Sequence, residues 1–415
     1  MLVAGIDIGA ELHHVAIVDD AEAVVVKATP FAEDAAGYQK LFELLARAGV
    51  RGGGDLPLAP ASGPTLVVME ATGHYWQNLF TALVTEGYAV ALVNPLRTHC
   101  FAGEEMARTK TDSIDCLQIA RFGAQKRPAP TCLPEAAAGE LRELVRLRTR
   151  LIQDMVDRVN QLHRLIDLGF PEFTRYLSDP NTALASVILR QYPTAQAFRT
   201  LSPRRLAKLT YDGRHRVGEE LARKLIDAAR ISVGSQHSQA HQTGVRYACE
   251  DLQTLRDRLK QLEAEISGQL EQHQVGKLLT TIAGIGDNTA AMLIAELGDP
   301  ARFQSAGAVA AYLGLCPGHK HSGKHQPKSS ALAPLGNRRV RQALWMPTLG
   351  AATQSNPWLM AFYRRLMDRG KPHKVALIAA MRKLVGAVYS VAKHRRPFVP
   401  FLNTQPAARL DYEKA

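Results

Sequence analysis

Four acidic residues in the first third of the chain have the chemistry and the positions of ligands for a divalent cation. Asp7 lies inside the apolar run GIDIG, and Glu70 ends the apolar run LVVME. Asp112 and Asp115, in KTDSID, are three residues apart, which puts both on one face of a helix. Carboxylates and water are the ligands that Mg²⁺ prefers. Such a set predicts a metal centre, where two ions about 3.5–4 Å apart would stabilise the attacking and leaving oxygens of a phosphoryl transfer.

The four acids also have structural interpretations that need no metal. Asp112 and Asp115 fit a helix N-cap with its capping-box acid, and Glu70 fits a solvated strand end. Asp7 is the hardest to explain in this way, because a carboxylate inside a buried strand is costly unless it is paired or bound to a metal. The prediction of a metal centre therefore depends most on Asp7.

A glycine-containing turn between two apolar helical segments is the second candidate site. Residues 278–297 read LLTTIAGIGDNTAAMLIAEL, so Gly284 and Gly286 separate two helices. Glycine permits positive φ and a close approach of the backbone, and the free N–H groups at the next helix start point at a phosphate. The pattern predicts a helix–hairpin–helix element that holds a nucleic-acid backbone without reading its sequence. An ordinary helix turn is the alternative.

A serine surrounded by histidines and lysines is the third candidate. Residues 318–330 read GHKHSGKHQPKSS, with Ser322 in a Ser-Gly step and Lys320, Lys324 and Lys328 nearby. A serine hydroxyl is a weak nucleophile unless a base or cation activates it, and cations suit attack on a phosphate. The alternatives are a phosphate-binding loop without a catalytic role and a weak metal-binding tract.

The elements that would position the four acids are those of an α/β domain. Five strand patterns and two helix patterns occur in the first 125 residues: strands over 2–9, 13–19, 23–28, 65–73 and 88–95, and helices over 75–86 and from residue 112. The first three strands are joined by short turns and are expected to pair antiparallel, and a Gly- and Pro-rich loop covers 49–64. Three antiparallel strands followed by strand–helix–strand units is the order of an RNase H-like fold.

The middle of the chain is predicted to be helical. Apolar residues recur at a spacing of three to four over 141–166 and 252–266, with Arg148 as a polar interruption of the first seam. Such seams form two-stranded coiled coils, within one chain or between two copies, and the sequence leaves both open. Residues 170–244 have no assigned fold. The predicted divisions are 1–125, an α/β catalytic domain; 126–272, a helical coiled-coil linker for dimerisation; 273–400, a mostly α-helical C-terminal domain; and 401–415, a tail.

Positive charge is concentrated toward the C-terminus. The chain of 415 residues has 51 Lys and Arg against 39 Asp and Glu, a net charge of +12. Residues 316–396 contain 16 Lys and Arg and one acid, which is +15 and leaves −3 for the rest. A localised basic region is typical of nucleic-acid binding, whereas a merely solvated face mixes both signs. The candidate nucleic-acid contacts are Gly284, Gly286, Lys320, Lys324, Lys328, Arg338, Arg339, Arg341, Lys371, Lys374, Arg382 and Lys383.

The composition argues against secretion and membrane insertion. Hydrophobic residues make up 46% and charged residues 22% of the chain, as in globular proteins with an ample core. The five cysteines are scattered, so neither a disulfide framework nor a cysteine zinc site is expected. The start MLVAGIDIG lacks the basic region of a signal peptide, and apolar stretches of about 18 residues are all interrupted. We expect a cytoplasmic protein.

Together these motifs resemble the IS110 family of bacterial insertion-sequence transposases, which includes the IS-eleven-eleven subgroup. Asp7 in GIDIG, Glu70 in MEATG and the two acids of KTDSID resemble the DEDD catalytic tetrad of that family. Four C-terminal segments resemble its C-terminal transposase domain: AGIGDNTAAMLIAELGDPARF, AAYLGLCPGHKHSG, LGNRRVRQALWMPTL and RGKPHKVALIAAMRKLV. The resemblance covers two blocks, 1–125 and 275–396, joined by a coiled-coil seam that the family also has.

The resemblance implies more than the residues show alone. It implies a RuvC-like N-terminal domain whose four acids hold Mg²⁺, with Mn²⁺ as an alternative. It implies that Ser322 forms a covalent phosphoserine link to DNA, and that the metal centre and this serine meet between protomers of a homodimer or tetramer built on the coiled coil. It also implies double-stranded donor and target DNA as substrates, a structured non-coding guide RNA encoded by the element, and a place at the bacterial nucleoid.

Three other functions fit part of the sequence. A two-metal structure-specific DNA endonuclease of the Holliday-junction resolvase type would use the four acids without a covalent serine step. An actin-like kinase or ATPase also begins with GIDIG, but it expects a Ser/Thr/Gly-rich phosphate loop where ELHH follows here. A non-catalytic nucleic-acid scaffold gives no reason for Asp7 inside a strand.

Overall fold

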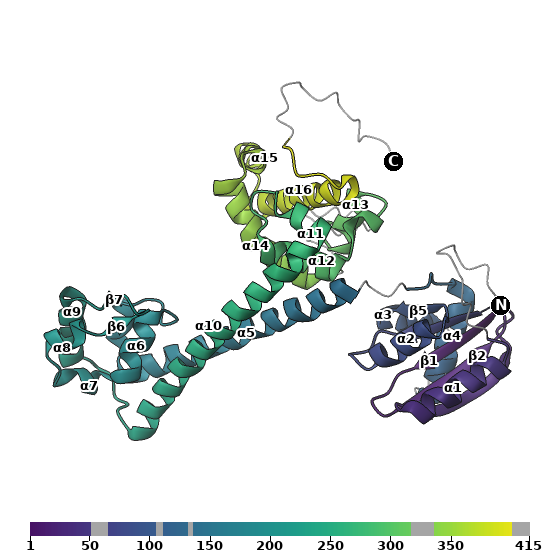
Figure 1. Ribbon diagram of the computed structural model, residues 1–415, viewed down its shortest axis with the longest axis horizontal. Coiled ribbons are helices and arrows are strands. Elements are labelled where there is room, and N and C mark those ends of the chain that lie inside the picture. The colour runs from purple at the N-terminus through teal and green to yellow at the C-terminus, as the bar shows by residue number, and fades with distance from the viewer. Residues whose placement is uncertain (51–64, 105–110, 132–135, 317–335, 401–415) are drawn as a thin grey trace, which may run out of the picture. The chain divides into compact units, whose positions relative to one another are not determined.

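A computed structural model describes residues 1–50, 65–104, 111–131, 136–316 and 336–400. The chain divides into two units, Met1–Pro134 and Glu135–Ala415 (Figure 1). The predicted middle region, apart from residues 126–134, and the predicted C-terminal domain both belong to the second unit. The predicted tail and most of the predicted loop over 49–64 lie outside the described residues.

The first unit is built on a five-stranded mixed sheet. β1 (Leu2–Asp7), β2 (Leu12–Val18) and β3 (Val24–Ala32) pair antiparallel. β4 (Thr65–Glu70) pairs parallel with β1, and β5 (Val90–Val93) pairs parallel with β4. The strand order is β3-β2-β1-β4-β5. All five predicted strands are present, and their order confirms the predicted α/β domain of RNase H-like type.

Helices cover both faces of this sheet. α1 (Ala35–Arg47) and α2 (Trp76–Thr85) pack on one face, while α3 (Pro95–Glu104) and α4 (Asp112–Lys126) pack on the other. Side chains alternate along a strand, so Ile6 faces α1 and α2 and Val3 faces α4. α1 and α3 lie outside the predicted elements. α1 begins after Asp34, whose side chain accepts a hydrogen bond from the Gly37 amide and so caps the helix.

Glycines let α4 lie directly on the sheet. A Cβ at Gly5 would collide with the backbone of Cys116 and Ala120, so a larger residue would push the helix away. A Cβ at Gly123 would lie 2.6 Å from Cγ1 of Val3. Because Ala120 lies over Gly5 and Gly123 lies over Val3, α4 runs antiparallel to β1. Its first turn is therefore at the C-terminal end of β1.

Two long helices, packed against each other, connect the two cores of the second unit. α5 (Ala136–Gly169) and α10 (Gln239–Gln272) pack against each other (Figure 1). Arg148 of α5, the polar interruption of the first seam, donates two hydrogen bonds to Oε1 of Glu263 of α10, at 2.6 and 2.9 Å. The two apolar seams therefore meet within one chain, which is the intramolecular alternative left open by the sequence.

A folded body lies between α5 and α10 in sequence, where the sequence shows no clear pattern. Its elements are η1 (Pro171–Arg175), α6 (Ala183–Gln191), α7 (Ala195–Arg199), α8 (Pro203–Ala207), β6 (Thr210–Tyr211), β7 (His215–Arg216) and α9 (Glu219–Arg230). Its core is built around Phe170, Phe173 and Phe198, with ring centroids of Phe170 and Phe198 5.1 Å apart. Ile166 of α5 and Leu252 of α10 complete this core, so the body is fixed to both long helices.

The remaining helices form a separate core within the second unit. They are α11 (Gln274–Leu279), α12 (Asp287–Leu297), η2 (Pro300–Arg302), α13 (Ala306–Tyr312), α14 (Arg338–Gly350), η3 (Ala351–Ser355), α15 (Pro357–Asp368) and α16 (His373–His394). Within the described part of the chain, α16 alone is long and apolar enough to cross a membrane. Its Leu377, Leu384 and Val388 are fully buried in this core, which accounts for its apolar composition.

Candidate active site

The ends of β1 and β4 place Asp7 and Glu70 side by side. These two strands pair in parallel, with Ile6 opposite Met69, so Asp7 and Glu70 are the next residues in the same register. Neighbouring strands lie about 4.8 Å apart. Because Ile6 and Met69 point into the core under α1 and α2, the acids that follow them point toward the face covered by α4.

The first turn of α4 brings the other two acids to the same end of the sheet. Asp112 and Asp115 are the acids of that turn. The helix is capped by the Thr111 side chain, which accepts a hydrogen bond from the Ile114 amide. The capping role that the sequence offered as an alternative for Asp112 therefore belongs to Thr111. The Asp112 side chain is 72% exposed and is available to a ligand.

The electrostatics of Asp7 show that the four acids interact. Its pKa is raised to about 6, first by burial and then by the negative charges of Asp115, Asp112 and Glu70. The pKa of the neighbouring Cys116 thiol is raised to about 12, by burial and then by Asp7. The structure thus places all four predicted acids at one end of the sheet, near enough for the charges of three of them to raise the pKa of the fourth.

The side chains of these acids do not converge on one point, because Glu70 is turned toward two hydroxyl groups. Thr98 donates a hydrogen bond to Oε1 of Glu70 at 2.5 Å, and Thr72 donates one to Oε2 at 3.4 Å. Among the described residues, no three His, Cys, Asp or Glu side chains lie close enough together to hold a metal ion as they stand. The donor chemistry and the backbone positions therefore fit a divalent cation, whereas Glu70 has to turn from its two hydroxyl partners to become a ligand.

Two residues beside the acids were not predicted from the sequence. His14 lies opposite Asp7 in the antiparallel register of β1 and β2, with Nδ1 3.9 Å from Oδ2 of Asp112. Thr98 of α3 holds Glu70. The register of the β1–β2 hairpin would have indicated His14, but no local sequence signal indicates Thr98, because α3 lies outside the predicted elements.

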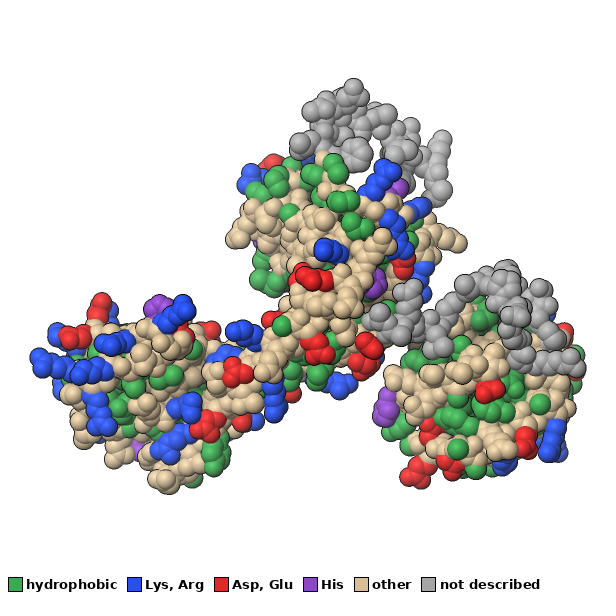
Figure 2. Space-filling view, in the orientation of Figure 1, with side chains coloured by type: hydrophobic (Ala, Val, Ile, Leu, Met, Phe, Trp, Pro, Cys, Tyr) green, Lys and Arg blue, Asp and Glu red, His purple; other side chains and the backbone are tan. Residues whose placement is uncertain are grey.

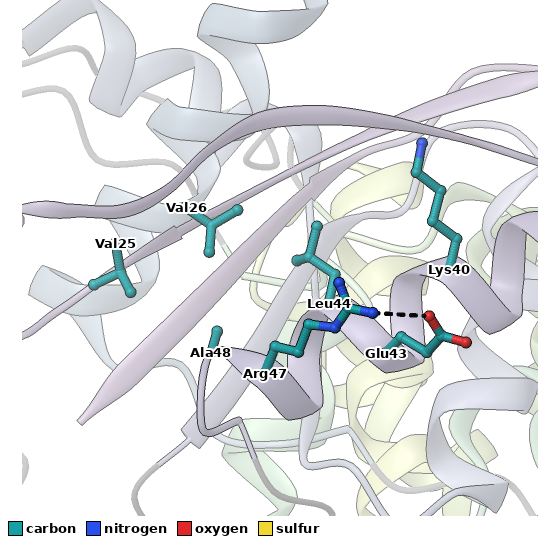
Figure 3. Close-up of a pocket in the computed structure, with 7 residues that line it drawn as sticks. All are labelled: Val25, Val26, Lys40, Glu43, Leu44, Arg47 and Ala48. Atoms are coloured by element: carbon teal, nitrogen blue, oxygen red, sulfur yellow. Dashed lines mark ion pairs between the residues drawn. The ribbon is translucent and has the colours of Figure 1, made fainter.

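A pocket elsewhere in the first unit does not belong to this site. It has a volume of about 440 Å³ and lies between β3 and α1 (Figure 3). Arg47 and Glu43 form an exposed ion pair at its edge, with Nη2 and Oε2 3.5 Å apart. Because α1 covers the face of the sheet opposite to α4, this pocket is separated from the four acids by the sheet itself.

The predicted serine segment lies outside the described residues. Ser322 and the neighbouring Lys320, Lys324 and Lys328 all fall within 317–335. Their assignment as nucleophile and nucleic-acid contacts stays a prediction.

The glycine turn before α12 has a packing role. Gly284 has φ of +99°, and a Cβ there would lie 2.5 Å from Cβ of Ala351. Gly286 is the N-cap of α12, and the first residue of that helix is Asp287, which accepts a hydrogen bond from the Ser267 hydroxyl. A carboxylate therefore lies where a phosphate was predicted to bind. Nucleic-acid binding by this turn stays a prediction.

The described basic residues of the C-terminal region differ in their surroundings. Arg341 donates to the carbonyl of Leu313 at 3.0 Å, and Nζ of Lys383 lies 4.2 Å from the ring centroid of Trp358. Burial lowers the pKa of Lys383. Of the predicted nucleic-acid contacts that the structure describes, the exposed cations are Arg338, Arg339, Lys371, Lys374 and Arg382. Three of these lie in the first turns of α14 and α16, where the helix dipole disfavours positive charge, and Nη1 of Arg339 lies 3.9 Å from Oε1 of Glu296. Nucleic-acid binding by these residues stays a prediction.

Comparison with known protein families identifies the class of this fold and site. Residues 4–171 match a family described as a transposase of the DEDD IS110 type, so the α/β unit is the DEDD domain of an insertion-sequence transposase. Residues 276–364 match the transposase IS116/IS110/IS902 family. The chain belongs to this family, whose members cut and rejoin DNA.

Individual relatives agree with this assignment over most of the chain. The chain is 28% identical over 336 residues to the pilin gene-inverting protein of Moraxella bovis, which covers 80% of this chain and 81% of that protein. It is 26% identical over 408 residues to the 44.8 kDa protein of insertion element IS116 of Streptomyces clavuligerus, covering 95% and 96%. T. thermophilus RuvC in complex with a Holliday junction substrate matches 32% of this chain and 99% of that chain, with 18% identity and a TM-score of 0.23. The fold assignment depends on the strand order and not on this last match.

Proposed function

We propose that Asp7, Glu70, Asp112 and Asp115 bind divalent cations, and that this centre cleaves DNA during transposition. The observation that carries the proposal is the raised pKa of Asp7 at the paired ends of β1 and β4. Burial and the three neighbouring acids disfavour the ionised form of Asp7, and a cation beside it would favour that form. We propose Mg²⁺, with Mn²⁺ as an alternative, because the donors are carboxylate oxygens.

Two packing contacts position the four acids of this centre. Parallel pairing of β1 and β4 fixes the separation of Asp7 and Glu70. The contact of α4 with Gly5 fixes Asp112 and Asp115 above them. A bound cation supplies charge stabilisation for the attacking and leaving oxygens of the phosphodiester.

Removal of divalent cations tests this centre. With DNA that carries the ends of the parent element, we expect strand cleavage to stop in chelator and to return when Mg²⁺ or Mn²⁺ is added. We also expect the added cation to raise the melting temperature of the DNA-free protein, because it binds only the folded state. Cleavage that continues in chelator would contradict the proposal.

We further propose that Ser322 is the nucleophile for DNA cleavage. The support is its place between Lys320 and Lys324 and the family resemblance of the surrounding segment. In this step a bond forms between Oγ and phosphorus as the bond from phosphorus to a deoxyribose oxygen breaks. The hydroxyl proton passes to a base, and the leaving oxygen is protonated. Direct hydrolysis by water, as in a resolvase-type endonuclease, is the alternative.

We also propose that a structured non-coding RNA from the element supplies sequence recognition by base pairing.

We propose in addition that two copies of the protein associate along the middle of the α5–α10 pair. Ile152 and Val156 of α5 are one turn apart, as are Leu255 and Leu259 of α10. These four side chains belong to neither buried core of the second unit: Val156 is 47% exposed, and the other three are only partly buried where the two helices meet. An apolar strip on a helix pair is typical of a bundle interface. The expected place of this assembly is the bacterial nucleoid.

Light scattering of the purified full-length protein, followed by sequencing of any bound RNA, tests this assembly. We expect the mass of a dimer or tetramer and an RNA of discrete length. Val156→Asp should reduce the mass, because it puts a charge into the strip. The matched control is Val233→Asp, at a side chain that is 79% exposed outside the strip, and it should leave the mass unchanged. A monomer without RNA would contradict both parts of the proposal.

A further inference from the structure

We propose that the folded body between α5 and α10 carries a second DNA-binding surface, formed by α8 and the β6–β7 hairpin. We call it the basic hairpin surface, and it consists of Arg204, Arg205, Lys208, Arg214 and Arg216. None of its residues is among the four proposed metal ligands or the C-terminal basic residues.

This body has a net positive charge, although the chain outside 316–396 has a net negative charge. Residues 170–238 contain 11 Lys and Arg and 6 Asp and Glu, which is +5, although the chain outside 316–396 sums to −3. Residues 204–216 alone contain five Lys and Arg and one acid. Lys and Arg side chains are seen over the body formed by α6–α9 in Figure 2. Positive charge of this density on one short segment attracts a polyanion.

The local fold turns all five cations outward. Leu206 and Ala207 of α8 are buried against the body, so the positions on either side of them, which carry Arg204, Arg205 and Lys208, face solvent. Arg214 and Arg216 are exposed as well. Among the residues that the structure describes, no carboxylate forms an ion pair with any of the five. Their charges are therefore available to a ligand.

The hairpin turn is held in one conformation by its single acid. Asp212 and Gly213 both have positive φ, +54° and +77°. Oδ1 of Asp212 accepts hydrogen bonds from the amides of Arg214 and His215 at 3.2 and 3.1 Å, and Oδ2 lies 3.0 Å from Nδ1 of His215. The carboxylate is thus used within the turn and does not pair with the arginines. A fixed turn reduces the entropy lost when Arg214 binds a phosphate.

The composition of the surface favours a DNA backbone over a lipid or protein partner. Four of the five cations are arginines, whose forked donors match phosphate oxygens. Between residues 204 and 216 no large apolar side chain is exposed, whereas membrane-binding and protein-binding surfaces add apolar anchors to their charges. Because the family cuts and rejoins DNA, we infer that the partner is duplex DNA beside the cleaved site, held without sequence readout.

The salt dependence of DNA binding tests the inference with two matched triple variants. The test variant is Arg204→Ser, Arg214→Ser and Arg216→Ser. The control is Arg223→Ser, Lys224→Ser and Arg230→Ser on α9 of the same body, where each cation is paired with Glu219, Glu220 or Asp227 at 2.6–3.2 Å. Both remove the same formal charge. Binding of a DNA duplex by the full-length protein is measured in chelator, so the result does not depend on the metal or serine steps of the proposed function.

We expect the test variant to lower the slope of log affinity against log salt by about 0.9 for each phosphate that the protein no longer neutralises, about 2.7 in all. This corresponds to a decrease in affinity on the order of 100-fold at moderate salt. The control should keep the wild-type slope, and both variants should keep the wild-type melting temperature. An unchanged slope in the test variant, an equal change in the control, or a decrease confined to an RNA duplex of the same length would overturn the inference.

Discussion

Asp7→Asn is expected to abolish strand cleavage, by about a thousandfold or more, and at the same time to stabilise the metal-free protein above pH 6. Loss of one carboxylate from the proposed metal centre removes several kcal/mol of stabilisation of the reacting oxygens. The stability gain has a separate cause. The ionised Asp7 carboxylate is destabilised by burial and by three neighbouring acids, and asparagine carries no charge.

The pH dependence of stability follows from the raised pKa. Asp7 has a pKa of about 6 in the folded protein against an ordinary value of 3.8. Between these values the folded state binds more protons than the unfolded state, so stability falls as pH rises from 3.8 to about 6 and stays low above it. With allowance for screening at a half-exposed site, the loss is about 1–2 kcal/mol. Asp7→Asn should remove this part of the pH dependence.

Chemical unfolding as a function of pH, together with cleavage of DNA that carries the element ends, checks both effects. Addition of Mg²⁺ should stabilise the wild type and leave Asp7→Asn nearly unchanged. The control is Glu86→Gln in the same unit, at an exposed position away from the four acids, which should alter neither cleavage nor stability. A variant Asp7→Asn that still cleaves, or that is less stable than the wild type above pH 6, would show that Asp7 is a structural residue.

Ser322→Ala is expected to eliminate any protein–DNA adduct that survives denaturation, together with recombination. The alanine has no hydroxyl to form the bond to phosphorus, so the covalent step cannot occur. The two proposed mechanisms differ here. In the serine mechanism both adduct and recombination are lost, whereas in a resolvase-type endonuclease metal-dependent cleavage by water continues without an adduct.

Denaturing electrophoresis of labelled DNA after reaction measures the adduct and the cleaved strands together. Ser330→Ala, in the same segment, is the control and should behave as the wild type. Asp7→Asn should form neither adduct nor cleaved strand, because the metal centre is required for either mechanism. Full recombination by Ser322→Ala would refute the serine mechanism and leave the acid centre as the whole active site.

Local sequence patterns were sufficient for the elements and for the identity of the four acids. Continuous apolar runs predicted all five strands, and an acid within or at the end of such a run identified Asp7 and Glu70. The spacing of Asp112 and Asp115 predicted their common helix face, and α4 begins at Asp112. These features depend on residues within one or two turns of each other, which is the range over which sequence spacing controls geometry.

Only the tertiary structure shows which faces of the strands and helices pack against each other. The register of β1 with β4 placed Asp7 beside Glu70, and the contact of Gly5 with α4 set the height of the helix-borne acids. Packing also assigned the helix cap to Thr111 and paired Arg148 with Glu263 within one chain. The basic hairpin surface became visible only when its body was folded, since its short helices and two-residue strands have too few residues for a clear period. Spacing along the chain sets which side chains share a face, but burial between distant segments determines which faces come together.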